Sequence, residues 1–157
     1  MIPAVIRLKS PLNRIASVLY MDTVTIPSAN RASSLTLFDR EPEDREQELT
    51  HFSVRFVDTD ITAGTRVYGY MCGGLLDAFD RIASDWQTFA GPLEWSSLET
   101  EFSLTITHDG LGHFTIRTAL SRDLHDDGWG AVNHLRLETS QLDRIASDLR
   151  AFMGNCS

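Results

Sequence analysis

Alternation of polar and apolar residues is the sequence feature that most constrains the fold of this chain. A period of two places successive side chains on opposite faces of a β-strand. The pattern occurs in seven segments, at 23–26, 34–37, 52–56, 66–70, 102–106, 114–120 and 132–137. Each segment predicts a strand with one buried and one solvated face. Turns are predicted at 27–30 and 62–64, and the Gly-rich turn 109–112 predicts a hairpin.

Two further segments change to the helical period. The first has its apolar stripe from Leu75 to Phe89 and is followed by the stop signal Gly91-Pro92; the second runs from Leu142 to Met153, with Ser140 as the expected N-cap. The resulting order is ββββ-α-βββ-α. We therefore predict an α+β fold in which one antiparallel sheet of about six to seven strands is covered on one face by two amphipathic helices.

The two helical segments share a motif. Residues 79–86 read FDRIASDW and residues 142–149 read LDRIASDL, so six consecutive residues are identical. Internal duplication of the helix is one interpretation. Convergence of two helices that meet the same sheet is the other. The strands show no matching identity, so the sequence does not extend the duplication to them.

Length and composition indicate one domain. We expect residues 23–157 to form it, and residues 1–22 to be an N-terminal arm or a mis-assigned start, with Met21 as the true first residue. No apolar run approaches 18 residues, and the N-terminus lacks the features of a signal peptide, so neither a membrane span nor secretion is expected. Cys72 and Cys156 form no CxxC motif, which favours a reducing, cytoplasmic setting.

The charge balance bears on the partner. The net charge is −8, with 22 acidic and 14 basic residues. An acidic chain is a poor ligand for a phosphate backbone, so we expect no nucleic acid partner. A basic protein partner is compatible with this charge, and so is acidity that serves solubility alone.

The histidines do not predict a metal site. His108 continues the alternation of 102–106 and is expected to point toward the buried face, whereas His113 precedes Phe114 and is expected to point outward. Ligands on opposite faces of a hairpin cannot share one ion, and no Cys or third His lies at ligand spacing. We therefore expect no metal and no cofactor.

Outward-facing positions predict a binding surface. If the strands are neighbours, the parity that buries the apolar residues exposes a basic and hydroxyl-rich patch on an acidic protein, which is typical of a binding face. Trp129 lies at a turn, where it either anchors a partner or covers the end of the sheet. Cross-strand pairing and plain solvation are the alternatives for the charged residues. The candidate binding residues are Arg55, Arg117, Arg136, His113, His134 and Trp129.

Several segments resemble a family of small uncharacterised bacterial proteins, chiefly actinobacterial. The matching segments are 66–70 (RVYGY), 73–75 (GGL), 84–86 (SDW), 95–99 (WSSLE), 104–113 (LTITHDGLGH) and the helix that begins at 141–142 (QL). The resemblance covers about residues 23–154 and assigns no activity. More loosely, the order of a mid-chain helix, a Gly-turn hairpin and a closing helix looks like the WapI-type immunity proteins, and it implies a domain that binds and blocks a toxin.

The sequence carries no catalytic motif, and it favours a non-catalytic protein-binding domain, an immunity-type inhibitor of a basic toxin or enzyme. The charged loop 39–48, which looks too polar to pack, and the turns 109–112 and 126–130 are candidate contacts. The alternative is a small enzyme or ligand-binding domain with a site at the hairpin mouth, formed by His108, Asp109 and His113. A monomer or a weak homo-oligomer is expected.

Overall fold

The computed structural model describes residues 21–122 and 127–157, and within them it has eight strands and two helices. Residues 1–20, which make up most of the expected N-terminal arm, lie outside this range. The first group of elements is β1 (Thr23–Pro27), β2 (Ser34–Glu41), β3 (His51–Val57), β4 (Thr62–Tyr68) and α1 (Gly73–Asp85). The second group is β5 (Leu93–Ser96), β6 (Phe102–His108), β7 (His113–Arg122), β8 (Trp129–Glu138) and α2 (Thr139–Met153).

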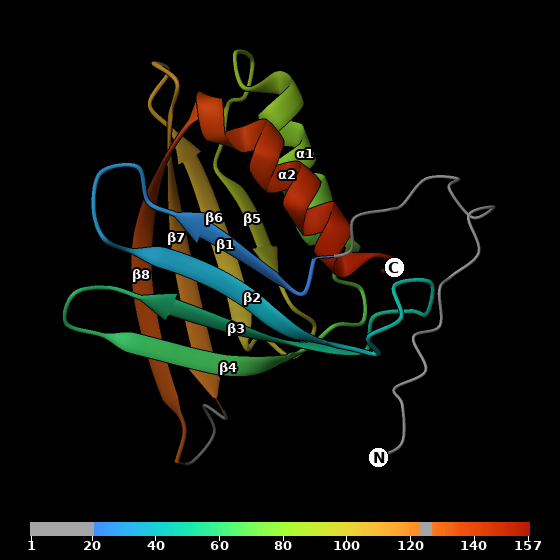
Figure 1. Cartoon of the computed structure of the whole chain (residues 1–157). Coiled ribbons are helices and arrows are strands. Elements are labelled where there is room, and N and C mark those ends of the chain that lie inside the picture. The colour runs from blue at the N-terminus through green and yellow to red at the C-terminus, as the bar shows by residue number, and fades with distance from the viewer. Residues whose placement is uncertain (1–20, 123–126) are drawn as a thin grey trace, which may run out of the picture.

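The α+β class and the antiparallel pairing are confirmed, but the single sheet is wrong. The strands form two separate four-stranded antiparallel sheets, β1-β2-β3-β4 and β5-β6-β7-β8, whose strands run across each other in Figure 1. The order is therefore ββββ-α-ββββ-α. The strand that the sequence did not reveal is β5, in which Trp95 pairs with Leu104. Its four residues follow Gly91-Pro92 and are too few to show a clear period of two.

The two ββββα units interlock through their helices. The helices lie side by side (Figure 1), and α1, which ends the first unit, contacts β5 of the second sheet, whereas α2 contacts β1 of the first sheet. Equivalent positions of the shared motif, Ile82 and Ile145, are both buried. The repeated ββββα order agrees with duplication of the whole unit, an extension to the strands that the sequence did not make.

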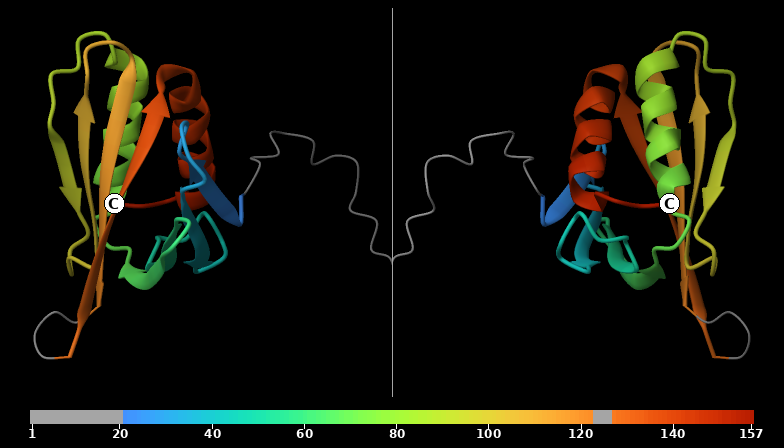
Figure 2. Two further views of the ribbon diagram at one scale, coloured as in Figure 1. Left: turned by 90° about the vertical axis from the view of Figure 1, so that its left-hand side faces the viewer. Right: turned by 90° about the vertical axis from the view of Figure 1, so that its right-hand side faces the viewer.

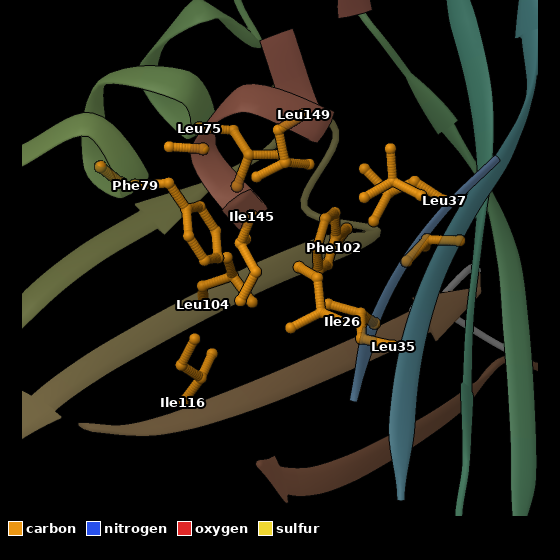
Figure 3. Close-up of a cluster of buried hydrophobic side chains, with 14 of the residues drawn as sticks. Ile26, Leu35, Leu37, Leu75, Phe79, Phe102, Leu104, Ile116, Ile145 and Leu149 are labelled. Carbon is orange, nitrogen blue, oxygen red and sulfur yellow. The ribbon is translucent and has the colours of Figure 1, made fainter. Parts of the chain in front are cut away.

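One hydrophobic core lies between the sheets and the helices. Figure 3 shows side chains from both sheets and both helices pointing into a common cluster. Burying a large apolar side chain contributes roughly 1.5–3 kcal/mol. The labelled members of this cluster are Ile26, Leu35, Leu37, Leu75, Phe79, Phe102, Leu104, Ile116, Ile145 and Leu149.

Two local predictions are wrong. Helix α2 begins at Thr139 and its N-cap is Glu138, not Ser140: the Glu138 side chain accepts the backbone N–H of Gln141, and the Gln141 side chain accepts the N–H of Glu138 at 2.9 Å. The expected turn 62–64 belongs to β4, and the chain reverses at 58–61 instead. No helix in the described part of the chain is long and apolar enough to cross a membrane.

Candidate binding surfaces

Three of the predicted binding residues lie together on the outer face of the second sheet. Arg117 pairs in register with His134, and Thr115 of the same strand pairs with Arg136. All of these side chains are exposed, because the opposite parity of β7 and β8 faces the core. The period of two predicted that these side chains point outward, and the pairing of β7 with β8 brings them together.

Arg55 lies apart from that cluster. It belongs to β3 in the first sheet, where its guanidinium carbon lies 4.9 Å from the centre of the Phe38 ring. The sequence grouped it with Arg117 and Arg136 because alternation predicts the face of a strand but not the sheet to which the strand belongs. Trp129 is the first residue of β8, in register with Arg122, and is partly buried against the core. This placement favours the second alternative, a side chain that covers the end of the sheet, over an exposed anchor for a partner.

The hairpin histidines point in opposite directions, as their parity predicts. The His108 ring stacks on Phe114, with centroids 4.4 Å apart, and its Nε2 accepts the backbone N–H of Gly112 at 3.1 Å. His113 lies outside, with its Nδ1 2.7 Å from Asp109 Oδ2. The three groups of the hairpin mouth therefore do not converge on one point.

Asp109 organises this turn. Its Oδ1 accepts the N–H groups of Leu111 at 2.7 Å and of His113 at 3.1 Å. The hydrogen bond from Leu111 and the contacts with His113 lower the pKa of Asp109 to about 2. Across residues 21–122 and 127–157, no group of three His, Cys, Asp or Glu side chains is placed to hold a metal ion.

The charged loop 39–48 packs, contrary to expectation. Arg40 is 3% exposed and donates to five backbone carbonyls: Met153 at 2.9 Å, Gln47 at 2.9 Å, Asp44 at 3.1 Å, Asn155 at 3.3 Å, and Pro42. Arg45 is 8% exposed and donates to the carbonyls of Met21 and Glu43. Buried guanidinium groups thus take the place of a hydrophobic anchor. The loop carboxylates remain outside: Asp39, Glu41, Glu43, Asp44, Glu46 and Glu48 are all exposed.

The C-terminal tail connects this loop to the start of α1. The Leu49 N–H donates to the Asn155 carbonyl at 2.9 Å, and the Gly73 N–H donates to the Ser157 carbonyl at 2.8 Å. The Ser157 hydroxyl binds Glu48 at 2.8 Å. Burial raises the pKa of the adjacent Cys72 thiol to about 12 and also raises the pKa of Cys156, so both thiols are poor nucleophiles at neutral pH.

Between the tail and α1 lies a groove of about 800 Å³, which we call the acidic groove. Tyr70 and Met71, at its edge, are 45% and 59% exposed. Asp77 and Asp80 of α1 supply carboxylates, and Asp80 pairs with Arg150. Sequence reasoning missed this groove because it joins segments about 80 positions apart, and 66–70 was interpreted only as a strand. The full lining is Tyr70, Met71, Gly73, Gly74, Leu76, Asp77, Asp80, Arg150, Cys156 and Ser157.

Comparison with protein-family models tests the resemblance to an uncharacterised family that the sequence suggested. The model of DUF6228, described as a family of unknown function, matches residues 26–156. The chain belongs to this family. The matched range contains every described strand and helix except the start of β1, so it covers both ββββα units. The comparisons with curated proteins and with solved structures found no match.

Proposed function

We propose that this member of DUF6228 is a non-catalytic, immunity-type binding domain that recognises a basic protein through the acidic groove. The observation that carries the proposal is the combination, at one surface, of two exposed apolar side chains and a set of carboxylates. Tyr70 and Met71 are exposed beside Asp77. Protein interfaces are enriched in Tyr and Met at their centre and have a polar rim.

Charge favours a basic partner. Glu48 of the loop adjoins the groove, because its carboxylate accepts a hydrogen bond from the Ser157 hydroxyl at 2.8 Å and Ser157 lines the groove. Carboxylates of the loop and of α1 therefore flank the same apolar centre. Complementary charge accelerates association and makes its rate depend on ionic strength.

Pre-organisation also supports recognition. Arg40 and Arg45 hold the loop in place, so its carboxylates need not be ordered when a partner binds. Ordering cost at an interface is subtracted from affinity, so a rigid surface binds more tightly. Met71 has a positive φ of 61°, a conformation that costs non-Gly residues roughly 1–2 kcal/mol. Such strain is common where a side chain serves recognition.

We propose that the protein acts in the cytoplasm of a bacterium. The family that its sequence resembles is chiefly actinobacterial. The looser resemblance to WapI-type immunity proteins agrees with an inhibitor that blocks a basic toxin or enzyme. Cys72 and Cys156 are free thiols, as is usual for a reducing compartment. We propose a monomer or weak homo-oligomer as the binding form, with no nucleic acid or membrane partner.

The test uses the full chain as bait in extracts of its native host, with capture followed by salt elution and mass spectrometry. We expect one stoichiometric basic protein, retained by Leu111→Ala and lost from Tyr70→Ala/Met71→Ala. Leu111, 81% exposed in the β6–β7 turn, is a matched control for loss of an exposed apolar side chain. An acidic partner, or a basic one retained equally by both variants, would overturn the proposal.

A small enzyme at the hairpin mouth is the second candidate. One observation favours it: Asp109 holds Nδ1 of His113, the contact by which a carboxylate orients a general base. Against it, His108 is turned away into the aromatic cluster. Substrate screening with His113→Gln tests this candidate, since an activity unaffected by that change would exclude a role for His113.

A further inference from the structure

A second hollow, independent of the acidic groove, lies where the outer face of the first sheet meets the ends of β6 and β7. Its volume is about 660 Å³. In Figures 1 and 2 the ends of β7 and β8 project beyond the first sheet, so that the two sheets form a corner. We call this hollow the arginine corner. The residues that matter for it are Phe38, Ser53, Arg55, Arg66, Glu101 and Arg122.

Positive charge is in excess in this corner. Of the six ion pairs in the described part of the chain, none includes Arg55 or Arg122. Arg66 has one partner, Glu41, at 2.6 Å. A chain with 22 acidic and 14 basic residues has enough carboxylates to neutralise its arginines, yet among residues 21–122 and 127–157 no carboxylate forms an ion pair with Arg55 or Arg122.

The carboxylate that belongs to the corner is already engaged. Glu101 Oε1 accepts the backbone N–H of Tyr68 at 3.3 Å, and its Oε2 accepts the Ser97 hydroxyl at 2.7 Å. These bonds hold Glu101 in its place directly before the first residue of β6. Its charge therefore reduces the positive potential of the corner without forming an ion pair with either arginine.

Arg55 is held in position before any ligand arrives. Its guanidinium lies over the Phe38 ring, an arrangement that favours Arg because the planar group stacks on aromatic faces. Gly64 pairs with Arg55 across β3 and β4. A Cβ at Gly64 would lie 3.1 Å from the Val54 carbonyl oxygen and 3.5 Å from Arg55 Cβ, so the glycine leaves the floor beside Arg55 open.

We propose that the arginine corner binds a phosphate-type dianion, either free phosphate or the phosphate group of a monoester. Guanidinium groups match the geometry of oxyanions through paired N–H donors, and several of them favour a dianion over a single carboxylate. Ser53, in register with Arg66 on the same face, supplies a neutral donor. The lining of this site shares no residue with the acidic groove, so the inference stands apart from the proposed function.

The test is an NMR titration of the full-length chain with inorganic phosphate, phenyl phosphate and acetate, at constant ionic strength. We expect saturable shifts at Arg55, Gly64 and Arg66 with both phosphates and none with acetate. Tighter binding of phenyl phosphate identifies a monoester as the ligand class, and tighter binding of inorganic phosphate identifies the free ion. Shifts that do not saturate, or equal binding of acetate, would overturn the proposal.

Matched variants separate the corner from general charge effects. Arg122→Ala should weaken binding about tenfold, whereas Arg117→Ala, on the same strand but on the outer face of the second sheet, should leave it unchanged. Glu101→Gln should strengthen binding, and Glu99→Gln should not. If Arg122→Ala does not fold, Arg122→Lys keeps the charge without the planar fork and should still weaken binding. Equal losses in Arg122→Ala and Arg117→Ala contradict a site at this corner.

Discussion

The links β2–β3 and β6–β7 occupy equivalent places in the two ββββα units, but charges of opposite sign complete their backbone hydrogen bonding. The first is the nine-residue link 42–50, and the second is the four-residue turn 109–112. At the first link a buried cation, Arg40 near the end of β2, gathers backbone carbonyls. In the second a surface anion, Asp109, gathers backbone N–H groups. Either sign of charge can complete the hydrogen bonding of a connection that lacks a regular ladder.

This difference has a structural consequence. The tight turn of the second unit is completed mainly by adjacent residues: Leu111 and His113 donate to Asp109, and the Gly112 N–H donates to His108. One further bond comes from the N–H of Thr139, at the start of α2, to the Gly112 carbonyl at 3.2 Å. The longer link of the first unit is completed by the C-terminal tail, because Arg40 also binds the carbonyls of Met153 and Asn155. The first link therefore depends on a segment more than 100 positions away, and its carboxylates reach the acidic groove only in the folded domain.

The largest expected effect concerns two phenylalanines at equivalent positions after the shared motif. Phe152 is fully buried and packs edge-on against Phe52 at 6.3 Å, whereas Phe89 is 8% exposed and lies beyond the end of α1. We expect Phe152→Ala to lower the free energy of unfolding by about 4–5 kcal/mol and Phe89→Ala by about 3 kcal/mol. Urea unfolding measures both. Equal losses would mean that the two units bury this position equally well, which would contradict the difference in packing between Phe152 and Phe89.

Removing the buried cation of the first link comes next. Arg40→Met keeps the length of the side chain but leaves five carbonyls without their donor, and we expect a loss of about 3 kcal/mol in the free energy of unfolding. Arg144→Met is the control, since Arg144 is 86% exposed and forms a surface i,i+4 pair with Asp148. Amide exchange should also accelerate at Leu49 and Asn155, which bridge the link and the tail. Unchanged exchange at both amides would show that the link is ordered without Arg40.

The same comparison explains what the sequence can predict. Alternation and the helical period locate seven of the eight strands and both helices, and parity places His108 inside and His113 outside, because these signals depend on neighbours in the chain. The hairpin turn 109–112 is predictable for the same reason. Local pattern does not say which strands share a sheet, so Arg55 was grouped with Arg117 although they lie in different sheets.

The sequence pattern also does not predict the burial of charged side chains. Eight of the ten residues in loop 39–48 are charged, which favours solvent, yet Arg40 and Arg45 are buried because backbone carbonyls replace water around them. The acidic groove and the arginine corner likewise arise from segments that only the tertiary fold brings together. For both surfaces the individual residues are visible in the sequence, and their proximity is not.

The smallest expected effect belongs to the second link and is a dependence on pH. The pKa of Asp109 is about 2 in the folded chain and near its usual 3.8 when unfolded, chiefly because Leu111 and His113 donate to its carboxylate. A depressed pKa stabilises the fold above pH about 4, and this contribution disappears as the pH falls through 2. Asp109→Asn should therefore be less stable than the parent at pH 5, by an amount that shrinks between pH 4 and pH 2.

Urea unfolding at pH 5, 4, 3 and 2.5 follows this convergence. Asp60→Asn, which removes an exposed carboxylate in the β3–β4 turn, is the control for the change in net charge. A constant gap for Asp109→Asn would show that the short link, unlike its counterpart in the first unit, does not depend on charge.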